Sequence, residues 1–311
     1  MAIYIVKRFF MMIATILIIA TLTFFLMHSI PGSPFDEERT SNPTIQANLE
    51  KYYKLDQPTH IQYLYYLKAI VTFDFGPSIK KPNESVNTQL ARGFPISAEL
   101  GIVSILVAVL SGITLGTFAA LRHNGIIDYG AMTFAVIGIS VPNFVLATLL
   151  IQQFAVNLQW LPPATWSSPK HMILPTLALA TGPTAIIARL TRSSMLEVLT
   201  QDYMKMARAK GLSPFRIVFR HALRNALMPI VTIMGTMLAG ILTGTFVIER
   251  IFAIPGMGKY FVESINNRDY PVIMGSTVFY SAFLVFMLFL VDIVYGFLDP
   301  RIKLHRKEGD A

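Results

Sequence analysis

The chain has 311 residues, of which 53% are hydrophobic and only 14% are charged, with a formal net charge of +8 at pH 7. A mean hydropathy of +0.54 leaves too little polar surface for a soluble protein of this length, so we expect an integral membrane protein. The absence of cysteine excludes disulfides, thiolate metal sites and cysteine nucleophiles.

Six stretches are apolar enough to cross about 30 Å of hydrocarbon as helices, which takes about 20 residues. They are Phe9–Met27, Gly101–Leu121, Gly130–Leu158, Met172–Ala188, Ala226–Ile248 and Val272–Val291. Pro175, Gly182 and Pro183 interrupt the fourth stretch, but neighbouring helices can satisfy the backbone groups that proline frees. The predicted fold is therefore an all-α membrane protein with six transmembrane helices.

Most of the lysine and arginine in short loops lies on the side of the N-terminus. Because short cytoplasmic loops carry an excess of these residues, both termini are predicted to be cytoplasmic. The net positive charge is then explained by the basic cytoplasmic loops of a protein in a lipid bilayer, and we expect no binding of nucleic acid. The chain divides into an N-terminal transmembrane helix (1–30), an external segment (31–96), a core transmembrane domain (97–298) that contains a basic loop (189–225), and a cytoplasmic tail (299–311).

The external segment is polar and rich in proline and tyrosine, apart from one stretch. Ile61–Phe73 is apolar and aromatic, yet it is too short to span a bilayer. We therefore expect a helix there that packs on protein or lies at the membrane interface.

The third predicted span has a polar side that lipid would not tolerate. Polar groups within membrane segments face protein or a water-filled path, and the spacing leaves both open. The residues concerned near the middle of the span, which are possible parts of a translocation path, are Ser140, Pro142 and Asn143, and those near its end are Gln152, Gln153 and Asn157.

Two G-x-x-x-G patterns, which allow helix backbones to approach closely, occur in the predicted spans. Gly112 and Gly116 form the first pattern, and Gly240 and Gly244 form the second. We expect both to pack within the helix bundle, with a subunit interface as the alternative.

Groups that could carry catalysis are nearly absent. Ser140 has no mid-span histidine to act as its base, the phosphate-binding pattern G-x-x-x-x-G-K-[ST] does not occur, and the histidines lack metal-site spacing. Asp292, near the end of the last span, is expected to pair with Arg301 or Lys303, with a proton relay as the alternative. The chain is therefore predicted to be non-catalytic and to bind no metal or cofactor itself.

The basic segment between the fourth and fifth predicted spans has the signals of two short helices. Thr200 is predicted to cap the first helix, and Asp202 in its first turn favours the positive end of the helix dipole. Gly211 is predicted to end this helix in a left-handed conformation, and Pro214 to begin the second.

On the first short helix, Tyr203, Met206 and Ala207 form one apolar stripe at i, i+3, i+4 spacing. A helix this short is marginal in water, so other groups should bury the stripe. The groove of a soluble partner is one possibility; the base of the same bundle or the lipid surface is the other. The cations beside the stripe are Lys205, Arg208 and Lys210.

Several motifs together resemble the inner-membrane permeases of binding-protein-dependent ABC importers, in the oligopeptide and dipeptide branch. The longest are ARAKGLSPFRIVFRHALRNALMP at 207–229 and IERIFAIPGMGKYFVESINNRDYPVIMG at 248–275. The others are PGSPF, LDQPTHIQYL, DFGPSI, GISVPNF and LDPRIK. They cover almost the whole chain, and the pattern is most similar to the first, B-type permease of an oligopeptide importer.

This resemblance implies a cell-membrane permease that forms half of the path of an ATP-driven peptide importer. Oligopeptides are the expected cargo, with dipeptides, glutathione or nickel chelates as the alternative, and an ion-coupled transporter is disfavoured because mid-membrane acids are nearly absent. The implied partners are a second permease, two ATP-binding subunits that hold ATP and magnesium, and an extracellular or periplasmic peptide-binding protein. The short basic helix would be the coupling helix, with ATPase contacts at Tyr203, Lys205, Met206, Ala207, Arg208, Lys210 and Gly211.

Overall fold

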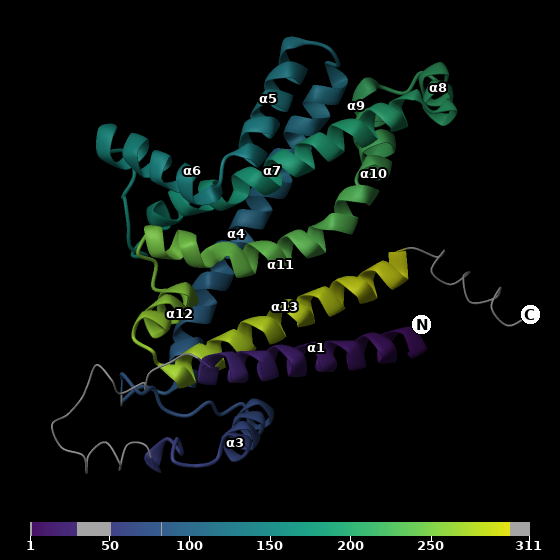
Figure 1. Cartoon of the computed structure of the whole chain (residues 1–311). Coiled ribbons are helices and arrows are strands. Elements are labelled where there is room, and N and C mark those ends of the chain that lie inside the picture. Colours follow the sequence, from purple (N-terminus) through teal and green to yellow (C-terminus); the bar gives the residue numbers. More distant parts are fainter. Residues whose placement is uncertain (1, 30–50, 82, 299–311) are drawn as a thin grey trace, which may run out of the picture. The chain divides into compact units, whose positions relative to one another are not determined.

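The computed structural model describes residues 2–29, 51–81 and 83–298, and the regular elements of this part of the chain are helices, with one isolated bridge between Pro77 and Ser85 and no β-sheet (Figure 1). The predicted tail (299–311), with Arg301 and Lys303, and the first part of the external segment lie outside the described residues. The helices long and apolar enough to cross a membrane are α1 (Ala2–Ser29), α4 (Val86–Leu121), α7 (Pro169–Thr200) and α13 (Tyr270–Leu298). Within the described ranges these four candidate spans become six if each of two bent helix pairs counts as one span.

The third predicted span is broken near its middle. α5 (Ile126–Ser140) and α6 (Asn143–Leu150), which continues as the π-helix η2 (Ile151–Asn157), meet at 108°. Pro142 accounts for the break, because proline disfavours helical backbone at the residue before it, and Val141 is extended (φ −87°, ψ 121°). The stretch from Gly130 to Leu158 is therefore not one unbroken helix, and it makes one of six spans only if the bent pair counts as a single span.

The fourth predicted span is continuous and longer than expected. α7 runs through both Pro175 and Pro183 and extends past the predicted end at Ala188 to Thr200. Arg189 and Arg192 consequently lie on a helix instead of in a loop.

A second bent pair, with a bend of 40°, contains the start of the fifth long apolar stretch. It joins the helix that starts at Pro214 to α11 (Met228–Ile251). After α11 the chain forms α12 (Met257–Asn266) and enters α13. The segments that make up the first arm of the pair are α9 (Pro214–Arg216), the π-helix η3 (Ile217–Ala222) and α10 (Leu223–Ala226).

The chain forms two compact units: residues up to Ile96 together with those from Gly256 onward, and residues Ser97–Pro255. In the first unit α1 packs along α13, as Figure 1 shows. Arg8 Nη1 lies 2.9 Å from Asp292 Oδ2 in this pair of helices. Asp292 is thus in an ion pair with a residue of α1, and the partners expected from the tail, Arg301 and Lys303, lie outside the described residues.

The short apolar stretch of the external segment forms a helix, α3 (Thr59–Thr72), as predicted. Its Tyr66 is buried against Ala20 and Phe24 of α1 and Val278 of α13. The packing on protein, which was one of the two expectations for this stretch, is therefore confirmed.

In the second unit the first G-x-x-x-G pattern packs α4 on α7. A Cβ added at Gly112 would lie 2.7 Å from the Ile187 Cβ, and Gly116 lies against Ala188 and Thr191. The expected packing within the bundle is confirmed here. At Gly240 an added Cβ would meet no atom of the described residues within 4 Å. The surroundings of Gly244 are not described, so the packing of the second pattern stays a prediction.

Candidate functional site

The basic segment forms α8 (Asp202–Ala209) directly after α7. Thr200 is the last residue of α7, and its hydroxyl donates to the Glu197 carbonyl over 2.8 Å, so the prediction that it caps α8 is wrong. The break falls at Gln201, whose backbone is extended (φ −65°, ψ 150°). The predicted stop is confirmed, since Gly211 has a φ of +72°.

The second short helix also begins as predicted. Pro214 is its first residue, and the Ser213 hydroxyl accepts a hydrogen bond from the Arg216 N–H over 3.4 Å. Serine before a first-turn proline is a favourable helix start, because it supplies a partner to a free N–H while proline needs none. Gly211 and Pro214 therefore set a tight turn between the two helices.

The apolar stripe of α8 is divided between two environments. Ala207 is 8% exposed and Met204 is fully buried, whereas Tyr203 is 42% exposed and Met206 is 60% exposed. The same bundle thus covers one side of the helix, and the other side lies open in the isolated chain. Burial on the same bundle is thus found for Ala207, and a partner or the lipid surface remains available to cover Tyr203 and Met206.

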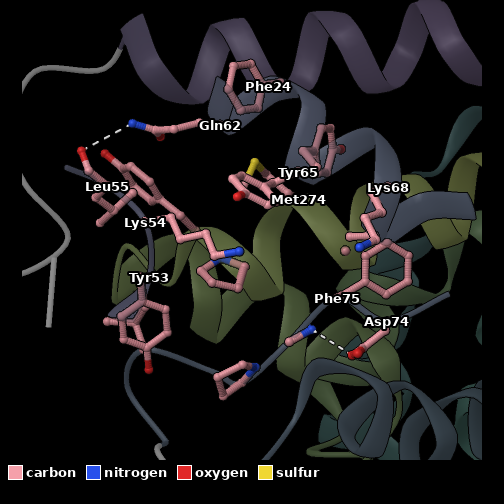
Figure 2. A pocket seen from close by; sticks show the side chains of 18 of the residues that line it. Phe24, Tyr53, Lys54, Leu55, Gln62, Tyr65, Lys68, Asp74, Phe75 and Met274 are labelled. Carbon is pink, nitrogen blue, oxygen red and sulfur yellow. Dashed lines mark hydrogen bonds between the residues drawn. The ribbon is translucent and has the colours of Figure 1, made fainter. Parts of the chain in front are cut away.

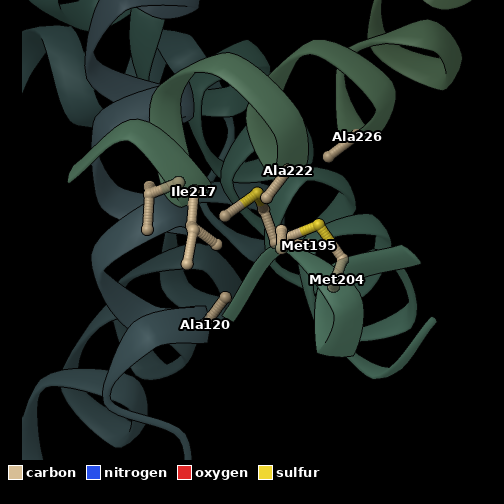
Figure 3. Packing of buried hydrophobic residues seen from close by; sticks show 8 residues of the cluster. Ala120, Met195, Met204, Ile217, Ala222 and Ala226 are labelled. Atoms are coloured by element: carbon tan, nitrogen blue, oxygen red, sulfur yellow. The ribbon is translucent and has the colours of Figure 1, made fainter. Parts of the chain in front are cut away.

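The buried side of α8 is seated in an apolar cluster that joins α8 to α4, α7, η3 and α10 in the second unit (Figure 3). Met204 lies against Met195 from α7, and Ala120 from the end of α4 joins the cluster. Full burial of a methionine stabilises the packing by about 1.5 to 3 kcal/mol. The remaining buried members are Ala207, Ile217, Val218, Ala222 and Ala226. α8 is therefore attached to the end of α7 by packing as well as by the chain.

The open side of this region combines apolar side chains with cations. Phe215 is 72% exposed and Phe219 is 52% exposed, and their ring centroids lie 4.4 Å apart. Phe215 belongs to α9 and Phe219 to η3, and together with Tyr203 and Met206 of α8 we call these exposed apolar side chains the open face of α8 and α9. The exposed cations of the same segment are Lys205, Arg208, Lys210, Arg216, Arg220 and Arg224. A groove with apolar walls and an acidic rim would complement this surface.

Sequence reasoning did not single out Phe215 and Phe219. Their i, i+4 spacing is the signal that could have found them, because such a pair lies on one helix face. It also did not single out an ion pair between Asp128 and Arg192, which are 64 residues apart. No local spacing could have predicted that pair, although an acid in the first turn of an apolar helix is a recognisable exception.

Asp128 is 2% exposed and its carboxylate accepts three hydrogen bonds, two from Arg192 and one from the backbone of Asn124. Arg192 donates to both oxygens, from Nε to Oδ1 and from Nη2 to Oδ2, the latter over 2.7 Å. The Asn124 N–H lies 2.9 Å from Oδ2, and His123 Nδ1 lies 3.2 Å from it. A bidentate arginine pair fixes geometry as well as charge, so this contact ties the start of α5 to α7.

The possible path residues Ser140, Pro142 and Asn143 all lie at the bend between α5 and α6, and all three are exposed in the isolated chain. The bend lies near Gly182 of α7: a Cβ added there would be 3.8 Å from Asn143 Oδ1. The polar residues further along η2 bond to one another, since Gln152 Nε2 donates to Asn157 Oδ1 over 3.2 Å. The three possible path residues therefore lie together at one bend, which is separate from the basic helix α8.

The first unit contains a cavity of about 380 Å³, the size class of small-ligand pockets. Figure 2 shows its aromatic and charged lining from α1, α3 and the start of α13. Lys54 Nζ lies 3.5 Å from the centroid of the Tyr65 ring, a cation–π contact. Burial, with the nearby Tyr63 second, raises the pKa of Tyr66 above that of an ordinary phenol.

A hydrogen-bond chain holds the loop at the edge of this cavity. His28 Nε2 lies 2.9 Å from Gln62 Oε1, and the Gln62 amide donates to the carbonyls of Leu55 (3.2 Å) and Gln57 (2.8 Å). Figure 2 shows the bond from Gln62 to Leu55. The loop that carries Lys54 is thereby fixed to α3 and to the end of α1.

Among residues 2–29, 51–81 and 83–298, no group of three or more histidine, aspartate or glutamate side chains could hold a metal ion.

Comparison with known proteins covers nearly the whole chain. Residues 112–304 match the family described as "Binding-protein-dependent transport system inner membrane component". Residues 1–100 match the family described as "Binding-prot-dependent transport system membrane comp, N-term".

Two curated relatives illustrate the range of similarity. The dipeptide transport system permease protein DppB of Bacillus subtilis (strain 168) is 70% identical over 307 residues, which is 99% of this chain and 100% of the relative. The oligopeptide transport system permease protein OppB of Salmonella typhimurium is 44% identical over 302 residues, with 96% of this chain and 99% of the relative covered.

Among solved structures, an inward-facing conformation of the MetNI methionine ABC transporter is similar in fold. Its TM-score is 0.54 at 19% identity, and the match covers 68% of this chain and 96% of the solved chain. An amino acid ABC transporter with histidines has a TM-score of 0.52 at 15% identity, covering 66% and 92% of the two chains. At these identities the likeness concerns the fold alone.

Proposed function

The chain belongs to the family of binding-protein-dependent transport system inner membrane components, and from this premise we propose that it is the permease subunit of a dipeptide importer. As a member it is a multi-pass inner-membrane protein and a non-catalytic subunit of an ABC peptide transporter. The observation that carries the dipeptide assignment is the 70% identity to a dipeptide permease, against 44% to an oligopeptide permease. The sequence-based expectation of oligopeptides is thus less well supported than its dipeptide alternative.

The family description implies a binding protein and an ATPase as partners. We further infer a second permease, two ATP-binding subunits that hold ATP and magnesium, and a peptide-binding protein that docks on the external side. In this proposal each bent helix pair counts as one span, which makes six spans with both termini in the cytoplasm. This chain and the second permease would each supply half of the translocation path, with Ser140, Pro142 and Asn143 lining it.

We infer that the open face of α8 and α9 docks in a groove of an ATP-binding subunit. What supports this inference is the division of α8, whose Met204 side is buried while Tyr203 and Met206 stay exposed among cations. ATP-bound partners would drive transport by preferring one conformation of the permease, as any conformational switch requires. α8 would pass their displacement to α7 through the shared apolar cluster.

A crosslinking experiment tests this docking, and the lack of native cysteine makes single-cysteine variants simple. Met206→Cys should crosslink to an ATP-binding subunit in the assembled transporter, because position 206 is exposed. Met204→Cys, on the buried side of the same helix, is the matched control and should not. Capture of lipid or of this chain alone at position 206 would refute the coupling assignment.

A competition experiment tests the cargo. In membrane vesicles that contain the transporter with its own binding protein, uptake of a labelled dipeptide should be inhibited by other dipeptides far better than by pentapeptides. Equal inhibition by both classes would return the assignment to oligopeptides.

A further inference from the structure

α7 has a weak point, by which we mean Gly182 and Pro183, where its backbone hydrogen bonding is interrupted. Pro183 has no N–H to donate to the carbonyl four residues earlier, and Gly182 beside it is the most flexible residue type. Helices bend at such places. α7 alone would therefore transmit a displacement of its C-terminal end poorly past Pro183.

α5 packs along α7 across this weak point. At Gly138 an added Cβ would lie 3.1 Å from Thr181 Cγ2 and 3.2 Å from the Ala185 Cβ. One of these α7 residues precedes Pro183 and the other follows it. The buried face of α5 consists of Asp128 and three small residues, Ala131, Ala135 and Gly138. Small residues let the two backbones approach closely along their length.

The Asp128–Arg192 pair fastens the other end of α5 to α7. Arg192 lies one turn before Met195, which belongs to the cluster that seats α8. The pair thus holds α5 to α7 on the α8 side of Pro183, and the Gly138 contact holds it at Pro183 itself. Because the Asp128 carboxylate is buried, loss of either charge would leave the other without its partner.

We propose that Asp128 and Arg192 are positioning residues that make α5 and α7 move as one rigid body. α5 then spans the part of α7 that lacks a backbone hydrogen bond at Pro183, and a displacement of α8 is passed on to the bend at Pro142. This inference rests on the proposed function, and it adds a specific device for coupling ATP hydrolysis to the path.

The first test measures the number of ATP molecules hydrolysed per peptide transported, in reconstituted transporter with its binding protein. Asp128→Asn keeps the side-chain shape but removes the charge, and this ratio should rise about 2- to 30-fold, the range of measured coupling effects. A purely structural role would lower the amount of transporter and both rates together, which leaves the ratio unchanged. An unchanged ratio would overturn the proposal.

A second variant restores the hydrogen bond that α7 lacks at Pro183. Pro183→Ala restores the backbone hydrogen bond of α7, so α5 should no longer be needed, and the ratio of the Asp128→Asn/Pro183→Ala double variant should return toward the wild-type value. Pro183→Ala alone should keep the wild-type ratio. Failure of this restoration, or loss of coupling in Pro183→Ala alone, would contradict the proposal.

A third test needs no change at Asp128. In Gly138→Cys/Ala185→Cys the two Cβ atoms lie near the separation that a disulfide requires. If α5 and α7 move as one body, an oxidised transporter should retain its uptake rate and its ATP-to-peptide ratio. A block of uptake on oxidation that a reductant reverses would show that the helices move relative to each other, and the proposal would fail.

The Arg8–Asp292 pair provides the matched control, since it also joins two helices by a carboxylate and a guanidinium. It lies in the first unit and has no part in the link to α8. Asp292→Asn should therefore leave the ATP-to-peptide ratio unchanged. The two proposals fail separately: wild-type transporter that does not import dipeptides refutes the cargo, whereas a wild-type ratio in Asp128→Asn refutes only the role of this pair.

Discussion

Ser78 donates a hydrogen bond from its hydroxyl to the carboxylate of Asp269, a residue 191 positions further along the chain. Asp269 is 4% exposed and also accepts from the backbone N–H groups of Ile79 (3.2 Å) and Lys80 (3.3 Å). The motifs DFGPSI and NNRDYP, which are distant in sequence, thus meet at one carboxylate of the first unit. Asp269 holds the loop after α3 to the turn that begins α13.

Asp269→Ala should destabilise the first unit, because it leaves two buried N–H groups and a hydroxyl without their acceptor. Each unsatisfied buried group costs about 1 to 3 kcal/mol. We expect faster proteolysis of the external segment and a lower unfolding temperature in detergent. Ser78→Ala removes the donor to Asp269 and the acceptor of the Lys81 N–H, but it leaves both backbone bonds to Asp269 in place and should have a smaller effect. Equal stability of Asp269→Ala and the wild type would show that this carboxylate does not hold the junction.

Gly112→Leu should prevent the close packing of α4 on α7. Even a Cβ at this position would lie 2.7 Å from the Ile187 Cβ and 2.9 Å from the Thr184 carbonyl oxygen, so neither atom can avoid it. We expect a large loss of folded protein in size-exclusion chromatography. Gly240→Leu is the matched control, since an added Cβ there meets no described atom within 4 Å. Similar yields of both variants would contradict the packing.

Met204→Ala and Met206→Ala should separate folding from docking on the same short helix. Truncation of the buried Met204 should cost about 2 to 5 kcal/mol of stability, whereas truncation of the exposed Met206 should cost little. Met206→Asp should instead weaken binding of the ATP-binding subunit, measured by co-purification. Normal co-purification of Met206→Asp would place the docking surface elsewhere.

Tyr65→Ala should weaken docking of the peptide-binding protein if an anchor side chain of that protein enters the cavity of the first unit. The substitution removes the ring under Lys54 and one aromatic wall, so affinity should fall about tenfold, as at other interface anchors. Binding of the purified protein to reconstituted transporter measures it. Trp160→Ala, an exposed aromatic of the second unit, is the control. Equal affinity of all three proteins would exclude the cavity as the docking site.

Local chemistry determined much of this protein from the sequence alone. The apolar stretches predicted the helices because hydrocarbon accepts only backbones whose polar groups are satisfied internally. The turn after α8 was predictable because glycine, here Gly211, adopts a left-handed backbone at little cost. Proline, here Pro214, suits the first turn of a helix, where its missing N–H leaves no bond unmade. The motifs of the permease family could likewise be recognised from the sequence alone.

Only the tertiary structure decided which groups meet. The stripe of Tyr203, Met206 and Ala207 follows from helical periodicity, but periodicity does not say that Ala207 is buried on the same bundle while Met206 is open. Pro142 explains the break in the third predicted span once the structure shows it, but the 108° angle depends on the packing of α5 and α6 against α7. The pairing of Asp128 with Arg192 joins residues 64 positions apart. Contacts at such separations depend on how whole helices pack, and no short stretch of sequence contains that information.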